Sequence, residues 1–598
     1  MAHTPSQKAA VVYDRNLILF AGPGSGKTST SIAKGRRILG IPDSRLCMVT
    51  FTTAAAAETQ QRMTASFANE RQQLPSDRLI TGTFHSLALR HYQRHVKGHP
   101  KLLPPPARSA MLQSMLAKYL KDDRAAYALS LEQYQGALNP SRLRIPAEHM
   151  GFIEEYLQKM AATHATDLAT IMRDCTMLMA AGEIPLLPIT HLIGDEMQDA
   201  DEVQLEFILN HTRSGVITTL VADDDQTIYE WRSALGYAGL QRFAAEANAK
   251  TITLGENFRS REEVVAHARV LIAHNDPDRI EKNQKAVRGD GGVLAAVRSA
   301  DLTTECEAVA EAIRDYRYDD EEIAILSRNN AALFQMEVAL AAEEIAYRRD
   351  GPTLWESREV GLMLSLMRAL ISSRTAELLP VLMLVELDPL VRKNLESKLG
   401  QSCGRFLDGE MPDLDGATAG ERSQLARLIE ASARWRSLLR GGDYNLAIPD
   451  IGYSVLSMYT NSSGYEGNGA QTKKISQHIE SAIKVLTKLR GSLSKRLNTL
   501  FLMQGRNDKE HAVRLMTMHS SKGLEFDTVY LINASNQDDG ATLMQDQPER
   551  RLFYVALTRA RERFFVTFSG EPVKYIFEAN LQEVPNLHDI FGAIRLES

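Results

Sequence analysis

The sequence has few cysteines and no long apolar run, and each shortage argues against a class of protein. The four cysteines lie far apart at Cys47, Cys175, Cys306 and Cys403, without a Cys-x-x-Cys pair. This spacing argues against a zinc site or an iron–sulfur cluster and is typical of a reducing cytoplasm. The most apolar stretches, 361–370 and 378–390, contain charged residues and are shorter than the ~20 residues of a membrane span. We therefore expect a soluble cytoplasmic protein.

Positive charge is scarce for a protein that would bind nucleic acid over its whole surface. The 598 residues include 69 Lys and Arg against 75 Asp and Glu, a formal net charge of −6. A nucleic-acid partner would have to bind in a local basic groove, helped by base stacking. Apolar residues make up 44% and charged residues 24%, as in ordinary soluble proteins. A chain of this length suggests about three to five domains.

Short apolar strands alternate with helices in both halves of the chain. In the first half the expected strands are 17–21, 46–51, 78–81, 189–194, 215–222 and 250–254. In the second half they are 292–298, 322–327, 512–517, 528–533 and 563–568. Long helical stretches interrupt each half. The pattern predicts an α/β fold with two parallel-sheet cores, each carrying a mainly helical insertion; separate domains joined by a helical linker are the alternative.

A glycine-rich turn follows the first expected strand and leads into a helix that begins near Lys27. Glycines let backbone N–H groups curl around phosphates, and the helix N-terminus adds a positive dipole. In such a loop the lysine reaches the β- and γ-phosphates, and the hydroxyl of Thr28 ligates Mg²⁺. The residues expected to bind ATP or GTP are Ala21, Gly22, Pro23, Gly24, Ser25, Gly26, Lys27, Thr28 and Ser29. A glycine-rich loop without a ligand is the alternative.

Two acidic residues, Asp195 and Glu196, come directly after the expected strand 189–194. Hydrolysis beside a phosphate loop needs one carboxylate for Mg²⁺ and another to polarise the attacking water. We expect Asp195 in the first role and Glu196 in the second. Without the phosphate loop, the pair would be interpreted as a solvated strand end.

The expected strand 215–222 leads into a second polar segment, 223–232, which ends in aromatic residues and an arginine. Gln226 lies in its polar part, which we expect to face the γ-phosphate. Tyr229, Trp231 and Arg232 can stack on unpaired bases, a contact worth roughly 1–3 kcal/mol per base. Packing of the aromatic pair against the core is the alternative. The short spacing suggests a link between nucleotide state and base stacking.

Together these segments resemble the UvrD/Rep/PcrA group of superfamily-one DNA helicases over nearly the whole chain. The matching segments occur in family order at 5–9, 49–58, 81–88, 195–199, 224–232, 255–260, 516–526 and 549–560. The resemblance implies two RecA-like P-loop NTPase cores that use ATP and Mg²⁺. It also implies 3′→5′ travel on single-stranded DNA.

The resemblance further implies roles for single side chains. The implied catalytic residues are Lys27, Asp195, Glu196, Gln226, Arg259 and Arg559, the two arginines touching the γ-phosphate from different sides. Gln7 would read adenine, Phe258 would stack on it, and Glu525 would lie near the ribose. The candidate DNA contacts are Phe51, Thr83, His85, Tyr229, Trp231, Arg232 and His519.

The chain departs from these relatives in places. Ser29 stands where many relatives have an arginine that packs against the base of the bound nucleotide. In the segment 49–58, Thr53-Ala54 replaces the usual Asn-Lys. The second insertion looks shortened. The expected domains are a first core at 1–85 and 186–262 with its insertion at 86–185, and a second core at 263–370 and 506–598 with its insertion at 371–505.

Residues 473–490, inside the second insertion, have apolar residues at helical spacing with lysines between them. Ile475, Ile479, Ile483 and Leu486 are expected to face a core, with Lys473, Lys484 and Lys488 near solvent. A solvated charged face is the ordinary interpretation of such lysines. A surface that contacts phosphates of duplex DNA is the alternative.

On this basis we expect an ATP-dependent 3′→5′ DNA helicase or translocase for repair, replication or recombination. Its partners would be single-stranded DNA and junctions of single- and double-stranded DNA, with a nuclease or repair factor as a protein partner. The alternative is an ATPase subunit that senses DNA ends in a multi-protein complex, for example in anti-phage defence, and activates a nuclease with little unwinding. The shortened insertion leaves this alternative open.

Overall fold

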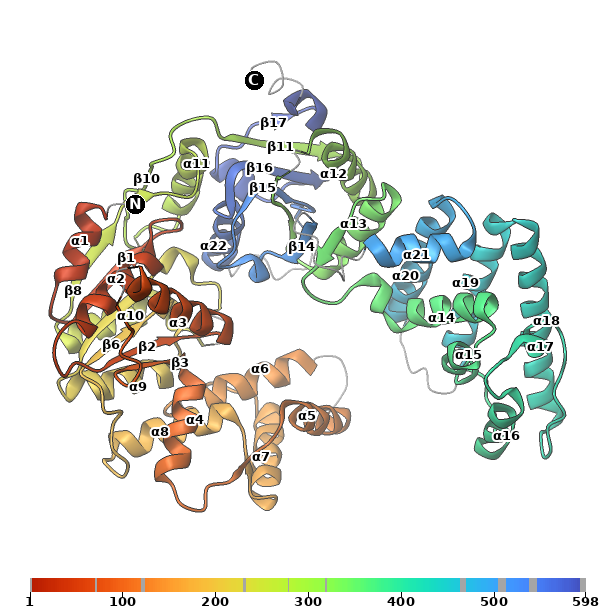
Figure 1. The fold of residues 1–598 in the computed structure, drawn as a ribbon, viewed down its shortest axis with the longest axis horizontal. Helices are drawn as coiled ribbons and strands as arrows, with labels where there is room; N and C mark the ends of the chain where they lie inside the picture. Colours follow the sequence, from red (N-terminus) through yellow and green to blue (C-terminus); the bar gives the residue numbers. More distant parts are fainter. Residues whose placement is uncertain are drawn as a thin grey trace. The chain divides into compact units, whose positions relative to one another are not determined.

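The computed structural model describes residues 3–69, 72–119, 124–229, 233–277, 279–317, 320–462, 469–503, 512–536 and 546–591. The chain folds as two units, which Figure 1 shows as ribbons. Unit 1 comprises Met1–Val293, Asp538–Glu562 and Glu578–Asn580. Unit 2 comprises Leu294–Gln537, Arg563–Phe577 and Leu581–Ser598. Residues 546–562, which the sequence analysis assigns to the second core, thus group with unit 1, and the expected domain limits stay a prediction.

Unit 1 is built on a six-stranded sheet with the order β3-β2-β6-β7-β1-β8, and every neighbouring pair is parallel. The strands are β1 (Leu17–Ala21), β2 (Leu46–Thr50), β3 (Leu79–Thr83), β6 (His191–Gly194), β7 (Ile217–Ala222) and β8 (Lys250–Leu254). They confirm the six strands expected in the first half of the chain. In a parallel sheet the carboxyl ends of the strands meet at one edge. The glycine-rich turn after β1 and the acidic segments after β6 and β7 therefore lie along the same edge.

Alternating side chains of the strands divide the core of unit 1 into two layers. On one face Leu17 and Leu19 of β1 pack with α1 (Pro5–Val12), α2 (Lys27–Leu39) and α3 (Thr53–Ala68). On the other face Ile18 and Phe20 pack with α4 (Phe84–His95), α8 (Leu168–Ala180), α9 (Glu202–Arg213) and α10 (Gly236–Ala247). Each layer is apolar, so burial of both faces holds the sheet and fixes its register.

The helical stretch in the middle of unit 1 has two parts. Its first and last helices, α4 and α8, pack on the sheet, as described above. Between them α5 (Pro105–Tyr119), α6 (Arg124–Gln135) and α7 (Ala147–Ala162) form a small core of their own, with Phe152, Ile153 and Tyr156 at its centre. A two-stranded ribbon, β4 (Lys101–Leu102) with β5 (Ala165–Thr166), also lies in this stretch. The helical composition is as predicted from the sequence.

Unit 2 contains a seven-stranded sheet with the order β13-β14-β12-β15-β16-β11-β17. The strands are β11 (Val293–Ser299), β12 (Ile323–Ser327), β13 (Tyr347–Arg349), β14 (Val513–Thr517), β15 (Phe526–Leu531), β16 (Ala560–Ser569) and β17 (Glu583–Val584). Five of these confirm the strands expected in the second half, and the short β13 and β17 were not expected. The helices nearest in sequence to its first strands are α12 (Leu302–Tyr316) and α13 (Asn330–Ala342).

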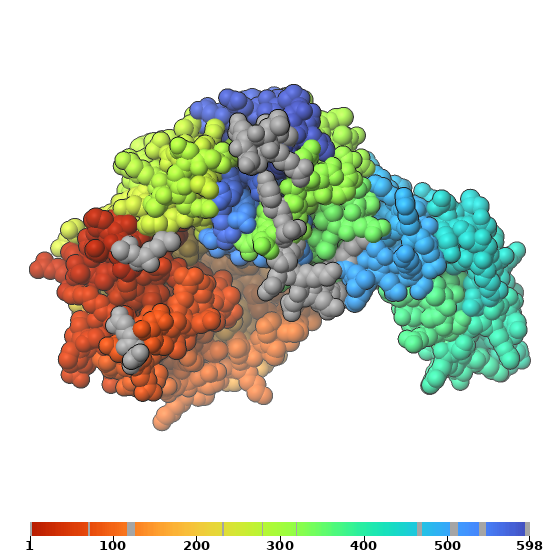
Figure 2. Space-filling model, turned by 45° about the horizontal axis from the view of Figure 1, so that its top comes forward, coloured from red at the N-terminus to blue at the C-terminus, as the bar shows by residue number. Residues whose placement is uncertain are grey.

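The second helical stretch follows in unit 2. Its helices are α14 (Arg358–Ser372), α15 (Thr375–Leu382), α16 (Pro389–Leu399), α17 (Gly404–Leu407), α18 (Ala419–Gly441), α19 (Tyr444–Thr460), α20 (Gly469–Lys488) and α21 (Leu493–Met503). Figure 2 shows α15 to α19, coloured green to cyan, gathered together, and α19 packs on α14 and α20. The two-core α/β architecture with helical insertions is therefore observed as predicted.

Helix α20 confirms the predicted division of its side chains. Ile475, Ile479, Ile483 and Leu486 are buried. The ammonium of Lys484 lies 3.0 Å from Glu307 on α12, and that of Lys488 lies 3.1 Å from Glu343, next to α13. These two lysines therefore already have carboxylate partners, which favours the ordinary interpretation over phosphate contact.

All four cysteines are buried free thiols, and burial raises the pKa of Cys47 and of Cys175 to about 12. Thiols held in the protonated form are poor metal ligands. Within the described parts of the chain, no helix combines the length and apolar character that a membrane crossing requires.

Candidate nucleotide-binding and catalytic site

The glycine-rich turn lies between β1 and α2 at the edge of the unit 1 sheet. Gly24 (φ 68°) and Gly26 (φ 80°) adopt left-handed conformations that favour glycine. A Cβ on Gly24 would lie 2.6 Å from Cβ of Arg259, and one on Gly26 would lie 2.6 Å from Nε2 of Gln7. Helix α2 begins directly after the turn, with Lys27, Thr28 and Ser29 in its first turn. The geometry is that of an anion-binding helix N-terminus.

Side chains from outside the turn hold its carbonyl groups. The amide of Gln7 donates to Ser25 O at 3.0 Å, and Nδ2 of Asn257 donates to Pro23 O at 2.9 Å. The N–H of Phe258 donates to Gly24 O at 2.8 Å. The amide of Gln284 packs over Gly22 and lies 3.4 Å from Pro23 O. With its carbonyls tied to these groups, the turn can present N–H groups to a phosphate chain.

The acidic pair follows β6, next to the turn. Nζ of Lys27 lies 3.2 Å from Oε1 of Glu196. Glu196 has a left-handed backbone (φ 55°), and its N–H donates to Oδ1 of Asp195 at 2.9 Å. Burial and the neighbouring carboxylate raise the pKa of Asp195 to about 6. Burial alone would lower the pKa of Lys27, but Glu196, Asp223 and Asp195 raise it.

Five hydrogen bonds connect Lys27, through Glu196 of this acidic pair, to Arg559. Lys27 donates to Oε1 of Glu196 at 3.2 Å, and Oε2 of Glu196 accepts from Gln198 at 2.6 Å. The backbone N–H of Asp223 donates to Gln198 at 3.0 Å, and Gln226 donates to Oδ2 of Asp223 at 2.6 Å.

The last step joins Nη2 of Arg559 to Oε1 of Gln226 at 3.2 Å. The network therefore brings together side chains that are more than five hundred residues apart in the sequence.

The two predicted arginine fingers lie beside the same residue. Nη1 of Arg259 donates to the backbone oxygen of Thr558 at 3.2 Å, and Nη2 of Arg559 donates to its hydroxyl at 3.1 Å. Arg559 is 1% exposed. Burial, together with the charge of Arg259, lowers the pKa of Arg559 to about 9. Two neighbouring guanidinium groups of this kind favour an anion between them, and charge that develops on a γ-phosphoryl group is such an anion.

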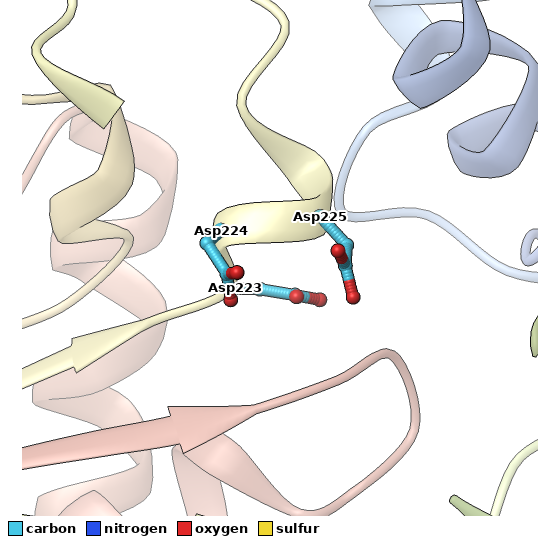
Figure 3. A group of neighbouring side chains, drawn as sticks. All are labelled: Asp223, Asp224 and Asp225. Atoms are coloured by element: carbon cyan, nitrogen blue, oxygen red, sulfur yellow. The ribbon is translucent and has the colours of Figure 1, made fainter. Parts of the chain in front are cut away.

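A cluster of three aspartates, Asp223, Asp224 and Asp225, follows β7 at the start of the short helix η3 (Asp224–Gln226). Their carboxylates gather on one side of this turn, as Figure 3 shows. The spacing is that of a metal site, but Nζ of Lys282 lies 3.2, 2.7 and 2.6 Å from the three carboxylates in that order. The ammonium of Lys282 thus occupies the position that a metal ion would have.

The remaining predicted ligands fall in different places. Phe258 is half-buried beside the turn, and its N–H bond to Gly24 O fixes its backbone there. Gln7 is held by the capping box at the start of α1. Glu525 is exposed and His519 is half-buried, both in unit 2. The predicted roles of these four residues with ATP or DNA stay predictions.

The predicted DNA contacts of unit 1 lie near the sheet edge. Phe51 packs on Phe84 with ring centroids 5.3 Å apart. The hydroxyl of Thr83 caps α4 by accepting from Ser86 N at 3.2 Å. Burial lowers the pKa of His85. Phe51 and Thr83 thus have a packing and a capping role besides their predicted roles in binding DNA.

Three predicted stacking residues follow Gln226. Tyr229 is half-buried, directly after Thr227 and Ile228, which are buried. Trp231 and Arg232 lie outside the described residues.

Models of known protein families match both halves of the chain. Residues 3–242 match the UvrD/REP helicase N-terminal domain, and residues 252–383 and 460–571 match the UvrD-like helicase C-terminal domain. The chain belongs to the UvrD/Rep helicase family.

DNA helicase II of Escherichia coli (strain K12) is 26% identical to it over 94% of this chain and 84% of its own length. The ATP-dependent DNA helicase Rep of the same strain is 26% identical over 96% of this chain and 92% of its own length.

Several residues of this UvrD/Rep-family site were missed in the sequence. Gln198 and Asn257 lie inside the family segments quoted above, and their polar side chains were the available signal. Arg279, Lys282 and Gln284 lie between α11 (Glu262–Ala273) and β10 (Lys285–Ala286), where no motif or periodic pattern marks them. They reach the site because β10 pairs with β9 (Glu256–Asn257).

Proposed function

We propose that this chain is an ATP-dependent DNA translocase and helicase that moves 3′→5′ on single-stranded DNA. The observation that carries the proposal is the hydrogen-bonded path from Lys27 to Arg559. It joins the phosphate loop, the acidic pair and an arginine, which are the parts that phosphoryl transfer requires. Family membership supports DNA as the polymer, and the names of the two E. coli relatives support helicase activity. The direction of travel rests on the family resemblance.

In this proposal the triphosphate of ATP binds at the start of α2. The N–H groups after Gly22 and the ammonium of Lys27 hold the phosphates, while Arg259 and Arg559 meet the charge that develops on the γ-phosphoryl group. Glu196 orients and polarises the attacking water. Its carboxylate is held by Lys27 and by Gln198, so it is already fixed before substrate arrives. Adenine would lie near Gln7 and Phe258.

The donor set also fits a magnesium ion. Thr28 offers a hydroxyl in the first turn of α2, and Asp195 offers a carboxylate whose pKa is raised by burial and by Glu196, so that a cation beside it would stabilise its ionised form. Mg²⁺ prefers such oxygen ligands together with substrate phosphates. When bound it would neutralise charge on the β- and γ-phosphates.

Coupling to DNA would run through the segment after Gln226. The hydroxyl of Thr227 donates to Asp224 O at 3.0 Å, and Thr227 and Ile228 are buried, so movement of Gln226 is passed along a packed segment. Tyr229 and, from the sequence, Trp231 and Arg232 would then shift against the bases. Single-stranded DNA and its junctions with duplex are the proposed substrates. We also propose a cytoplasmic location, with a nuclease or repair factor as protein partner.

The test is ATP hydrolysis with and without single-stranded DNA, using Lys27→Ala as the inactive control. We expect DNA to stimulate hydrolysis by the unmodified chain and not by the variant. Hydrolysis that does not respond to DNA would overturn the proposal.

A further inference from the structure

Lys282 has a buried position that the proposed chemistry does not use. Its side chain is 2% exposed, and the side chains of Asp223, Asp224 and Asp225 are 0%, 1% and 2% exposed. Burial alone would lower the pKa of Lys282, but the three carboxylates raise it above its usual value. The three carboxylates stabilise the buried charge of the lysine, and the lysine in turn fixes the positions of the carboxylates.

Arg279 completes the charges of this cluster. Its guanidinium donates to both oxygens of Asp225, at 2.8 and 3.0 Å. The same guanidinium also lies 3.2 Å from Asp276 and 2.9 Å from Glu281. Arg559 is buried at the end of the same network, where Glu196 and, across Gln226, Asp223 favour its charge.

The side-chain amide of Gln226 has a direction that depends on Asp223. Oδ1 of Asp223 lies 3.2 Å from Lys282, and Oδ2 accepts from Nε2 of Gln226 at 2.6 Å. Because Nε2 is used by Asp223, Oε1 of Gln226 faces Arg559. If Asp223 turned, the amide would lose the contact that makes it an acceptor for the arginine.

The chain segment around Lys282 also contacts the phosphate loop. Gln284, two residues after Lys282, packs its amide over Gly22. Ile280, two residues before it, donates its N–H to Oδ2 of Asp224 at 2.7 Å. Residues 279–284 therefore connect the aspartate cluster and the glycine-rich turn.

We propose that Lys282 is a positioning residue that fixes Asp223 and, through it, directs Gln226 toward Arg559. The ammonium occupies the position that a bound metal ion would have, so the hydrogen bonds from Asp223 through Gln226 to Arg559 are formed before ATP binds. This inference rests on the proposed ATPase function. It predicts that loss of Lys282 lowers kcat more than it changes KM for ATP, because Arg559 acts on charge that develops in the transition state.

The test separates positioning from simple neutralisation of charge. Lys282→Met with Asp224→Asn removes one positive and one negative charge, so the cluster keeps its net charge, and the amide oxygen of the introduced asparagine can still accept from the N–H of Ile280. Lys285→Met, on the exposed lysine of β10, is the matched control. Steady-state ATPase with single-stranded DNA and a crystal structure of each variant are the measurements. Lys282→Gln, which keeps a hydrogen-bond donor, is measured in the same way if the double variant does not fold.

We expect the variant at Lys282 to lose at least fivefold in kcat, with KM for ATP changed less than threefold. Its crystal structure should lack the hydrogen bond of Gln226 to Asp223 or to Arg559, while Lys285→Met keeps both. A loss in kcat smaller than fivefold, or a variant that keeps both hydrogen bonds, would overturn the inference. If the unmodified chain hydrolyses no ATP, the proposed function fails, and the crystal structures alone decide the positioning role.

Discussion

Arg559→Met removes the arginine that ends the network from Lys27. The guanidinium donates from Nε to Val555 O at 2.9 Å and from Nη2 to Gln226 at 3.2 Å and Thr558 at 3.1 Å. Methionine fills a similar volume but has neither charge nor donors. An arginine that stabilises a phosphoryl-transfer transition state is worth roughly 10³–10⁵ in kcat. We expect a loss of about 10³, which corresponds to about 4 kcal/mol of transition-state stabilisation.

The same substitution should change the stability little. The lost hydrogen bonds contribute about 1 kcal/mol each. In the opposite direction, a buried cation beside Arg259 is removed, and the lowered pKa of Arg559 shows that burial and this neighbour disfavour its charge. Removing such a charge relieves both the cost of its desolvation and its repulsion by Arg259, which offsets part of the loss. We expect the thermal midpoint to move by less than about 5 °C.

The assay is steady-state ATPase with saturating single-stranded DNA, together with equilibrium binding of a fluorescent ATP analogue. Arg561→Met, two residues further on, is the control for general disturbance. A kcat within tenfold of the unmodified chain would refute the reasoning. A loss of affinity for the analogue as large as the loss in kcat would also refute it, because the arginine would then bind the ground state equally.

Other substitutions test separate parts of the account. Lys27→Ala should lower ATPase at least about 100-fold, because it removes a cation that stabilises the charge developing on the phosphate. The circular dichroism spectrum and the weak DNA binding measured by anisotropy should not change. Trp231→Ala should leave DNA-stimulated ATPase but slow travel along single-stranded DNA, and unchanged travel would count against base stacking as the coupling. His211 should make stability fall below pH 6.5, because burial lowers its pKa to about 4 while its ring accepts from Leu187 N at 3.1 Å. Above pH 6.5 His211 is neutral in both the folded and the unfolded state. Between pH 6.5 and about 4 only the unfolded state binds the proton, so the free energy of unfolding falls by up to about 1.4 kcal/mol per pH unit. Urea unfolding of His211→Gln should lack this pH dependence.

The sheet of unit 1 and its phosphate loop are predictable from local sequence. Leu17–Ala21 is a continuous apolar run that ends in glycines, so both strand and turn are marked by neighbouring residues. Leu17 and Ile18 face opposite layers, although the run itself does not show which layer each faces. That division depends on helices that are distant in the sequence.

The rest of the site could not be predicted from local patterns. Lys282 and Asp225 are in contact because strands β9 and β10 pair, and a two-residue strand has no periodicity. Arg559 was found only through the family resemblance, since nothing near it in the sequence points to Lys27. The helices α4 and α8 pack on the sheet while α5 to α7 form a small core of their own, a division that the sequence analysis did not make.

Strand displacement by the purified chain tests the central claim most directly. Duplexes with a 3′ single-stranded tail, a 5′ tail or no tail are compared, with ATPase followed in the same reactions and Lys27→Ala as the control. The account predicts ATP-dependent displacement of the duplex with the 3′ tail in preference to the other two. DNA-stimulated ATPase without displacement of any substrate would contradict it and would favour a subunit that senses DNA ends.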